Sequence, residues 1–165
     1  MLKKLFGKKE ESKEATLVAP LDGKIVQLED VPDPVFSQKM MGEGIAIEPA
    51  NGEVVSPVEG EVVQVFPTKH AVGLQTKSGI ELLVHIGLET VSMDGEGFEA
   101  HVKQGDKVSA GDKLITFDVD LVNEKAKSSV TPVIITNSDS IENLETLNTG
   151  EAVKGETELL HVQMK

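Results

Sequence analysis

The sequence predicts an all-β fold with a few short helices, and three observations support this fold class. The 165 residues include five Phe and no Trp or Tyr, so the core must be built mainly from Val, Ile and Leu. Such side chains suit pleated strands and thin β layers. Short apolar runs are separated by Gly, Pro, Asp and Asn, which indicates many short strands. A ten-residue pattern also occurs twice, which predicts a β body with internal pseudo-symmetry.

The repeated pattern covers residues 19–28 (APLDGKIVQL) and residues 56–65 (SPVEGEVVQV), which align without gaps. Pro, Gly, Val and Gln are identical in the two copies, and several other positions keep their character. A small residue, Pro, an apolar residue, an acid and Gly predict a tight turn between two strands. A third such element is expected to begin at Thr131-Pro132-Val133.

Two Gly-Asp-Lys turns form a second signature, at residues 105–107 and 111–113, and lead into a predicted strand Leu114–Asp118. This spacing resembles the corner of a barrel-sandwich hybrid, the architecture of biotinyl and lipoyl carrier domains. The number of predicted strands indicates a larger version. A carrier of that kind also needs a modifiable lysine at a hairpin tip, for which Lys77 is the one reasonable candidate.

Helical signals are confined to two short segments. Asp33 and Pro34 are a typical N-cap and first helical residue, and Gly42 is a typical terminator. They predict a helix of about two turns between them. Residues 120–126 (DLVNEKA) are the second candidate.

The charge of the chain is unevenly distributed, although its net value is −12. Residues 1–14 carry five Lys and three Glu, whereas the remainder carries eleven Lys and twenty-five acidic residues. We expect a flexible basic N-terminal tail over residues 1–15 and a single domain over residues 16–165. Such an acidic body repels nucleic acid and attracts basic protein partners.

Several kinds of site and location are excluded by what the sequence lacks. Without Cys there is no disulfide, thiol nucleophile or Cys metal site, and without Arg the chain has no bidentate guanidinium for phosphate. No apolar run is long enough to span a membrane or to form a signal peptide, so a cytoplasmic location is predicted. Leu2, Leu5 and Phe6 are expected to make at most weak contact with a lipid surface.

Two of the four histidines lie on neighbouring predicted strands. His85 lies in an apolar run that predicts a largely buried strand, and His70 opens the strand before it. Residues 76–79 indicate a hairpin loop between them. If Gln75 pairs with Ile80, His70 lies directly opposite His85 on the same face of the hairpin. A shift of one residue would place the two side chains on opposite faces.

Two facing imidazoles leave two kinds of chemistry open, and the first is phosphoryl transfer through a phosphohistidine. One neutral ring attacks, and the second donates a hydrogen bond to the phosphoryl oxygens. Thr68 is placed to orient the ring of His70, and a backbone carbonyl near Gly87 is placed to fix the tautomer of His85.

The second possibility is a zinc site, in which His70 and His85 are joined by a third ligand, either water or one of the nearby acids Glu81, Glu89 and Asp94. The sequence contains no His-x-x-Glu-His or His-x-His motif, which disfavours a hydrolytic zinc enzyme. The transfer chemistry requires no metal, and no cofactor is expected. The other two histidines, at positions 101 and 161, are expected to have ordinary structural roles in strands.

Apolar side chains around the two histidines are candidates for a partner-binding surface. The first predicted helix contributes Val35, Phe36, Met40 and Met41, the flanks of His70 contribute Phe66 and Val72, and the flanks of His85 contribute Leu83 and Val91. Flexible Met side chains adapt to more than one partner. Asp33 and Glu89 are expected to form an acidic rim that pairs with Arg of a partner.

Six segments carry a resemblance to a known family: residues 19–23 (APLDG), 33–36 (DPVF), 67–71 (PTKHA), 83–91 (LVHIGLETV), 95–98 (GEGF) and 124–128 (EKAKS). In these segments the chain resembles the glucose-type enzyme IIA of the bacterial phosphoenolpyruvate:sugar phosphotransferase system, from about residue 16 to the end. The most specific feature is His-x-Gly-x-[Asp/Glu]-Thr-Val with Thr-x-His upstream. Glu89, where some members carry Asp, and the Met40-Met41 pair are departures that affect partner preference rather than chemistry.

The resemblance implies a compact antiparallel β-sandwich that acts as a phosphotransferase component. It implies that the phosphocarrier protein HPr phosphorylates His85, and that the phosphoryl group then passes to a cysteine of the IIB domain of a sugar permease. His70 would stabilise the phosphoryl group, and Thr68 would hydrogen-bond to His70. A free-standing IIA protein is expected, because the sequence has no permease spans.

A regulatory role is a further hypothesis that is compatible with the first. The same surface would bind permeases, other transporters or kinases while His85 is unphosphorylated, and the charge of the phosphoryl group would repel them. The resemblance assigns the choice of sugar to the permease.

Overall fold

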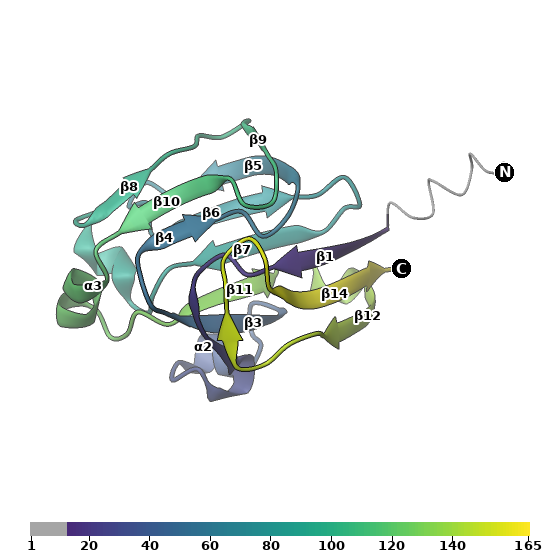
Figure 1. The fold of residues 1–165 in the computed structure, drawn as a ribbon, viewed down its shortest axis with the longest axis horizontal. Helices are drawn as coiled ribbons and strands as arrows, with labels where there is room; N and C mark the ends of the chain where they lie inside the picture. Colours follow the sequence, from purple (N-terminus) through teal and green to yellow (C-terminus); the bar gives the residue numbers. More distant parts are fainter. Residues whose placement is uncertain (1–12) are drawn as a thin grey trace, which may run out of the picture.

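Antiparallel strands dominate the computed structural model, which describes residues 13–165 (Figure 1). The largest sheet contains β2 (Gly23–Gln27), β3 (Glu43–Pro49), β5 (Gly60–Val65), β6 (Ala71–Gln75), β7 (Glu81–His85), β9 (Lys107–Val108), β11 (Thr131–Ile135) and β13 (Glu151–Ala152). Its order is β13-β2-β3-β11-β7-β6-β5-β9. The predicted all-β fold class is therefore confirmed.

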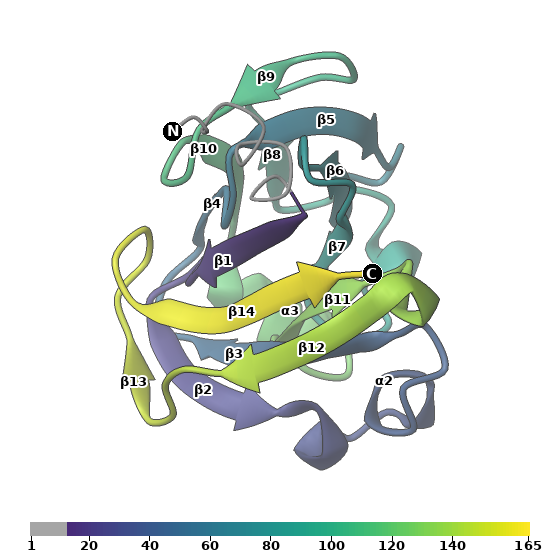
Figure 2. The same ribbon diagram turned by 90° about the vertical axis from the view of Figure 1, so that its right-hand side faces the viewer.

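Two smaller sheets of three strands complete the β structure. One has the order β1-β14-β12, and the other β4-β10-β8. Their strands are β1 (Glu14–Val18), β14 (Glu158–Met164), β12 (Ile141–Thr146), β4 (Glu53–Val55), β10 (Lys113–Phe117) and β8 (Phe98–Ala100). The first small sheet lies at the end of the molecule that faces the viewer in Figure 2. The expected basic tail and its lipid-contacting apolar residues fall mostly in residues 1–12, outside the described residues, whereas β1 begins at Glu14.

The helices are short, and the first is shorter than predicted. They are α2 (Pro34–Ser37) and α3 (Val119–Lys125), with the 3-10 turns η1 (Leu28–Asp30), η2 (Thr90–Met93) and η3 (Ser138–Ser140). Asp33 is the N-cap of α2, as expected, and accepts a hydrogen bond from the Val35 backbone N–H at 3.0 Å. The prediction of two turns is wrong, because Lys39 adopts φ +59° and turns the chain out of the helix. No helix within residues 13–165 is long and apolar enough to cross a membrane.

The internal repeat produces two equivalent strands, β2 and β5, each second from one end of the large sheet. The segments before them exchange matching hydrogen bonds: Val18 donates to the Pro57 carbonyl at 3.0 Å, and Val55 donates to the Pro20 carbonyl at 2.8 Å. Both bonds join positions that the alignment of the two copies makes equivalent. The predicted pseudo-symmetry is thus confirmed in the backbone.

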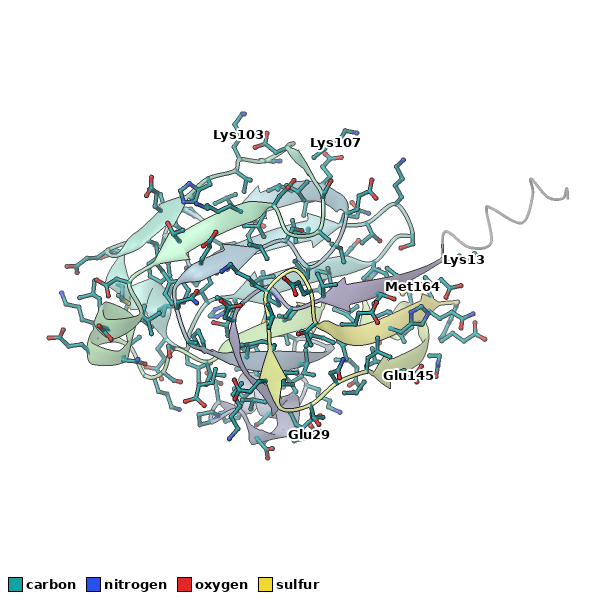
Figure 3. The ribbon with its side chains drawn as sticks, in the orientation of Figure 1. Lys13, Glu29, Lys103, Lys107, Glu145 and Met164 are labelled. Atoms are coloured by element: carbon teal, nitrogen blue, oxygen red, sulfur yellow. The ribbon has the colours of Figure 1, made fainter. Side chains whose placement is uncertain are left out.

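The corner at the Gly-Asp-Lys turns takes part in the same symmetry. Val108 of β9 pairs with Gly60, and Ala152 of β13 pairs with Gly23. Figure 3 shows the side chains of Lys103 and Lys107 pointing away from the body at this corner. The expected third copy is wrong: β11 begins at Thr131, but it is a central strand without the tight turn and Gly of the repeat.

Two hydrophobic clusters lie on opposite faces of the large sheet. Alternate residues of β7, such as Leu82 and Val84, enter the main core with Ile25, Ile45 and Val133. The other face forms a smaller cluster from Leu28, Val31, Phe36, Ala46, Ala71, Leu83, Leu88 and Ile134. Because η1 and α2 cover this second face, β11 is buried on both sides, and the strand ends nearby are held rigidly.

The β6–β7 hairpin has a register one residue away from the predicted one. Gln75 pairs with Glu81 rather than with Ile80, and Ala71 rather than His70 pairs with His85. The loop gains a residue because Gly79 adopts φ +92°, a conformation open to Gly. The predicted pairing of His70 with His85 within the ladder is therefore wrong.

Candidate functional site

His85 ends β7 on the face covered by the smaller cluster, and its ring has one nitrogen engaged. Its Nδ1 lies 2.9 Å from the Gly87 carbonyl oxygen, which can only accept, so Nδ1 carries the proton and donates. In the neutral ring Nε2 then has a free lone pair. The geometry provides a nucleophilic nitrogen of defined position.

His70 reaches His85 despite the shifted register. The two ring centroids are 5.0 Å apart, with the ring planes at 79°. His70 lies just before β6 and follows Lys69, which has φ +60°. The side chain of His70 therefore does not have to follow the alternation of faces along the strand. The backbone carbonyl of His70 accepts from the Ile86 N–H at 2.7 Å, which fixes the histidine beside the end of β7.

Thr68 lies against the ring of His70, as the sequence predicts. Its Oγ1 is 2.5 Å from His70 Nδ1. When the hydroxyl donates to Nδ1, the ring carries its proton on Nε2 and presents an N–H donor away from Thr68. The pair then consists of one ring with a free acceptor nitrogen and one ring with a free donor.

Burial keeps both rings neutral near pH 7. Burial, with a smaller contribution from the charge of His85, lowers the pKa of His70 to about 4. Burial also lowers the pKa of His85, while the Gly87 carbonyl and the Asp33 carboxylate oppose that shift. A neutral imidazole is the nucleophilic form, so the environment favours attack by His85.

Two phenylalanines make the apolar walls of the site. The Phe36 ring lies 5.2 Å from that of His85, and the Phe66 ring lies 5.6 Å from that of His70, measured between centroids. Phe36 is buried, whereas Phe66 is half-buried. These rings limit the positions of the imidazoles and lower the local dielectric constant.

Some of the side chains expected at a partner-binding surface are exposed, and others are buried. Val35, Met40, Met41, Val91 and Glu89 are exposed, and Asp33 is partly exposed. Phe36 and Leu83 are buried in the smaller cluster and can only support that surface from beneath. Val72 is completely buried in the main core, so the expectation that it contacts a partner is wrong. The burial of Val72 follows from the observed register of the β6–β7 hairpin, which turns this side chain to the inner face of the sheet.

Thr90 and Ser128 lie against Gly87, although neither was expected in the site. The Thr90 hydroxyl donates to the Ile86 carbonyl at 2.6 Å, and the Ser128 carbonyl accepts from the Leu88 N–H at 2.8 Å. Both residues occur in segments that carry the family resemblance. Their polar partners are backbone groups, however, which a sequence pattern does not reveal.

Other polar groups do not join the histidine pair. His101 is bonded to Thr116 through Nε2 at 2.9 Å, and His161 lies between Thr16 and Glu14 in the first small sheet. Within residues 13–165 no three His, Asp or Glu side chains gather in a geometry for a metal ion. A zinc ion on His70 and His85 would therefore take its further ligands from water or from outside this part of the chain.

Comparison with known proteins finds the same family that the sequence segments resemble. The model of the family described as phosphoenolpyruvate-dependent sugar phosphotransferase system, EIIA 1, matches residues 15–141. The glucose-specific EIIA component of Bacillus cereus is 57% identical over 165 residues, covering 100% of both chains. That of Halalkalibacterium halodurans is 56% identical over 172 residues, covering 100% of this chain and 99% of the relative.

A solved structure has the same fold. The glucose permease IIA of Mycoplasma capricolum superimposes with a TM-score of 0.85 at 47% identity, covering 90% of this chain and 96% of that chain. The fold, the histidine pair and the matches over the whole length all point to the same family. The chain belongs to the EIIA 1 family of the phosphoenolpyruvate-dependent sugar phosphotransferase system.

Proposed function

We propose that Nε2 of His85 accepts a phosphoryl group from the phosphocarrier HPr and passes it to the IIB domain of a glucose-type sugar permease. The observation that supports this most strongly is the pairing of the two rings. Each has Nδ1 engaged, His85 with the Gly87 carbonyl and His70 with Thr68. The pair therefore offers a lone pair for phosphorus and a donor for a phosphoryl oxygen.

The transfer step exchanges one P–N bond for another. The lone pair of His85 Nε2 forms the new bond as the bond to the phosphohistidine of HPr breaks, and the departing ring keeps its electron pair. Positive charge on the ring of His85 is stabilised by the Gly87 carbonyl through Nδ1–H. His70 donates from Nε2–H to a phosphoryl oxygen, and positioning supplies most of the catalysis.

An open surface suits a protein as the phosphoryl donor. A hollow of about 610 Å³ is lined by parts of β1, β5, β9 and the β6–β7 loop, and by none of the proposed site residues. Val35 and Val91 are instead exposed, and they are the chain neighbours of Phe36 and Thr90, which lie at the site. Because the chain has no Arg, the partner would supply guanidinium groups, which Asp33 and Glu89 would attract.

The direct test is phosphorylation of the purified protein with phosphoenolpyruvate, enzyme I and HPr. We expect one acid-labile phosphate per chain, which mass spectrometry maps to His85. His85→Ala should accept none. His101→Gln should be charged like wild type, since the ring of His101 is hydrogen-bonded to Thr116 on β10 and not to the site. Phosphate acceptance by the His85→Ala variant would contradict the proposal.

A regulatory role is a second candidate, favoured by exposed apolar side chains in the segments that follow α2 and Thr90. Met40 is 69% and Val91 56% exposed, and exposed apolar side chains of this kind mark interaction surfaces. Phosphorylation would add negative charge there and weaken binding of an acidic or apolar target. Pull-downs with the unphosphorylated and phosphorylated forms should retain transporters or kinases only in the first case. Equal capture by both forms would indicate a dedicated carrier.

We also propose that residues 16–165 act as one domain in the cytoplasm. The long-range pairing of β1 with β14 and of β13 with β2 supports this, because it joins both ends of the described chain into one body.

A further inference from the structure

A single peptide group determines which nitrogen of His85 is free. The carbonyl of the Gly87–Leu88 peptide accepts from His85 Nδ1 at 2.9 Å, and the N–H of the same peptide donates to the Ser128 carbonyl at 2.8 Å. A trans peptide points its carbonyl and its N–H in opposite directions. The bond to Ser128 on one side therefore aims the carbonyl at the imidazole on the other.

The preceding peptide is held by Thr90. The side chain of Thr90 is completely buried, and its hydroxyl donates to the Ile86 carbonyl at 2.6 Å. Ile86 itself is completely buried, so no water can replace this donor. Gly87, between the two fixed peptides, has φ +74°, a conformation that Gly adopts readily.

The methyl group of Thr90 makes a second contact at the same place. A Cβ at Gly87 would lie 2.6 Å from Thr90 Cγ2 and 2.9 Å from the Ser128 carbonyl oxygen. Thr90 thus closes the space beside Gly87 while its hydroxyl fixes the carbonyl before it. Hydroxyl and methyl act on adjacent atoms, and variants can separate them.

We propose that Thr90 is a positioning residue for phosphoryl transfer. Through the Ile86 carbonyl and the Gly87 peptide, its hydroxyl holds His85 in the orientation and tautomer that leave Nε2 free. The functional part of this inference depends on the proposed role of His85, whereas the tautomer can be measured in the free protein. Without the hydroxyl the Ile86–Gly87 peptide is no longer fixed, so Gly87 can change its backbone angles and turn its carbonyl away from the ring. Nδ1 then loses its acceptor, and the ring proton can move to Nε2.

The test compares Thr90→Val, which removes only the hydroxyl, with Thr90→Ser, which keeps it and removes the methyl group. Imidazole ¹⁵N chemical shifts at pH 7.5 report which nitrogen carries the proton. In wild type and Thr90→Ser we expect a protonated Nδ1 and an unprotonated Nε2. In Thr90→Val the two shifts should move toward each other, and acceptance of phosphate from HPr should slow about tenfold, as is typical when a supporting hydrogen bond is lost.

Thr76→Val is a matched control. Thr76 is also a buried threonine with a hydrogen-bonded hydroxyl, at the opposite end of the same hairpin. It should leave both the tautomer and the transfer rate of His85 unchanged.

Three results would overturn the inference. They are an unchanged tautomer in folded Thr90→Val, an equal change in Thr90→Ser, and an equal change in Thr76→Val. If Thr90→Val does not fold, exchange of the Thr90 hydroxyl proton with water is measured in wild type. Slow exchange supports the bond, and fast exchange overturns it. If phosphate maps to a residue other than His85, the proposed function fails while the tautomer result is still decided separately.

Discussion

The chemistry of the candidate site depends on small differences between two similar residues. His85 has its Nδ1 proton committed to a backbone carbonyl, whereas the Nδ1 of His70 meets a threonine hydroxyl. The first arrangement fixes one tautomer, and the second allows the other. Because burial lowers both pKa values, neither ring is obliged to carry a charge near pH 7. Two chemically identical side chains can therefore take the complementary roles of nucleophile and donor.

Replacing His70 by Gln should separate charging from onward transfer. Gln keeps an N–H donor near the phosphoryl group but loses the ring orientation set by Thr68. We expect His85 to be charged by HPr within about threefold of the wild-type rate. Transfer to IIB should slow by about a hundredfold, because a donor that is no longer held in place by Thr68 stabilises the transition state poorly. Single-turnover kinetics of the two half-reactions would measure this. Equal slowing of both steps would contradict the assigned role.

The lowered pKa of His70 predicts a stability change in mild acid. The folded pKa is about 4, below the ordinary value of 6.5, so the unfolded chain binds more protons between these limits. The free energy of unfolding should thus decrease as the pH falls from 6.5 toward 4, by about 3 kcal/mol from this group, and the contribution of His70 to the slope should vanish above about pH 8.

Urea titrations of wild type and His70→Gln at pH 7.5, 5.5 and 4.5 would isolate this contribution, because carboxylates titrate equally in both proteins. The pH dependence of the variant should be flatter. Parallel curves for the two proteins would show that His70 titrates normally in the folded state.

At the scale of elements, the sequence identified the hairpin, both strands of the repeat and the capped start of α2. It did not identify the register of the hairpin or the length of α2, because each depends on one residue at positive φ, Gly79 and Lys39. The depth of Val72 was missed for the same reason, since register decides which face a residue occupies. The histidine pair was nevertheless found, because His70 lies outside the regular strand.

The space around Gly60 and Gly79 predicts that Ala is tolerated much less well at the first position than at the second. A Cβ at Gly60 would lie 2.5 Å from the Gln75 carbonyl oxygen, whereas a Cβ at Gly79 meets nothing within 4 Å. Gly60→Ala should therefore destabilise the protein by about 3 kcal/mol or more, since the backbone itself must move. Gly79→Ala should cost only about 1 kcal/mol, for its positive φ. Denaturant unfolding of both variants would check this, and equal losses would show that the approach of β5 to β6 is not the limiting contact.

At the scale of the whole molecule, the fold places the histidine pair on an open face, backed by a second hydrophobic cluster, in a strongly acidic body. The smaller cluster buries Phe36 and Leu83 beneath the site, so the rings are held although the surface above them is open. Within that surface, exposed apolar side chains lie beside the acids Asp33 and Glu89. With a net charge of −12 and no Arg, the molecule supplies one sign of charge and requires the other from its partner.

This asymmetry predicts an association step that is sensitive to salt. The second-order rate of phosphate acceptance from HPr should fall about tenfold between about 0.02 M and 0.5 M NaCl, because screening removes the attraction at distance. Glu89→Gln should lower the low-salt rate about twofold to threefold and weaken the salt dependence.

Glu145→Gln serves as the matched control, because Glu145 is an exposed acid on β12 (Figure 3), which belongs to the first small sheet, whereas β6 and β7 belong to the large sheet. It changes the net charge by the same amount as Glu89→Gln but leaves the rim intact, so stopped-flow mixing at several salt concentrations separates the two contributions. If the partner is steered by the rim, Glu145→Gln behaves like wild type. If the second-order rate falls equally in the two variants, the attraction arises from the net charge of the whole domain. A rate that is independent of salt would mean that apolar contacts around Met40 and Val91 alone bring the partners together.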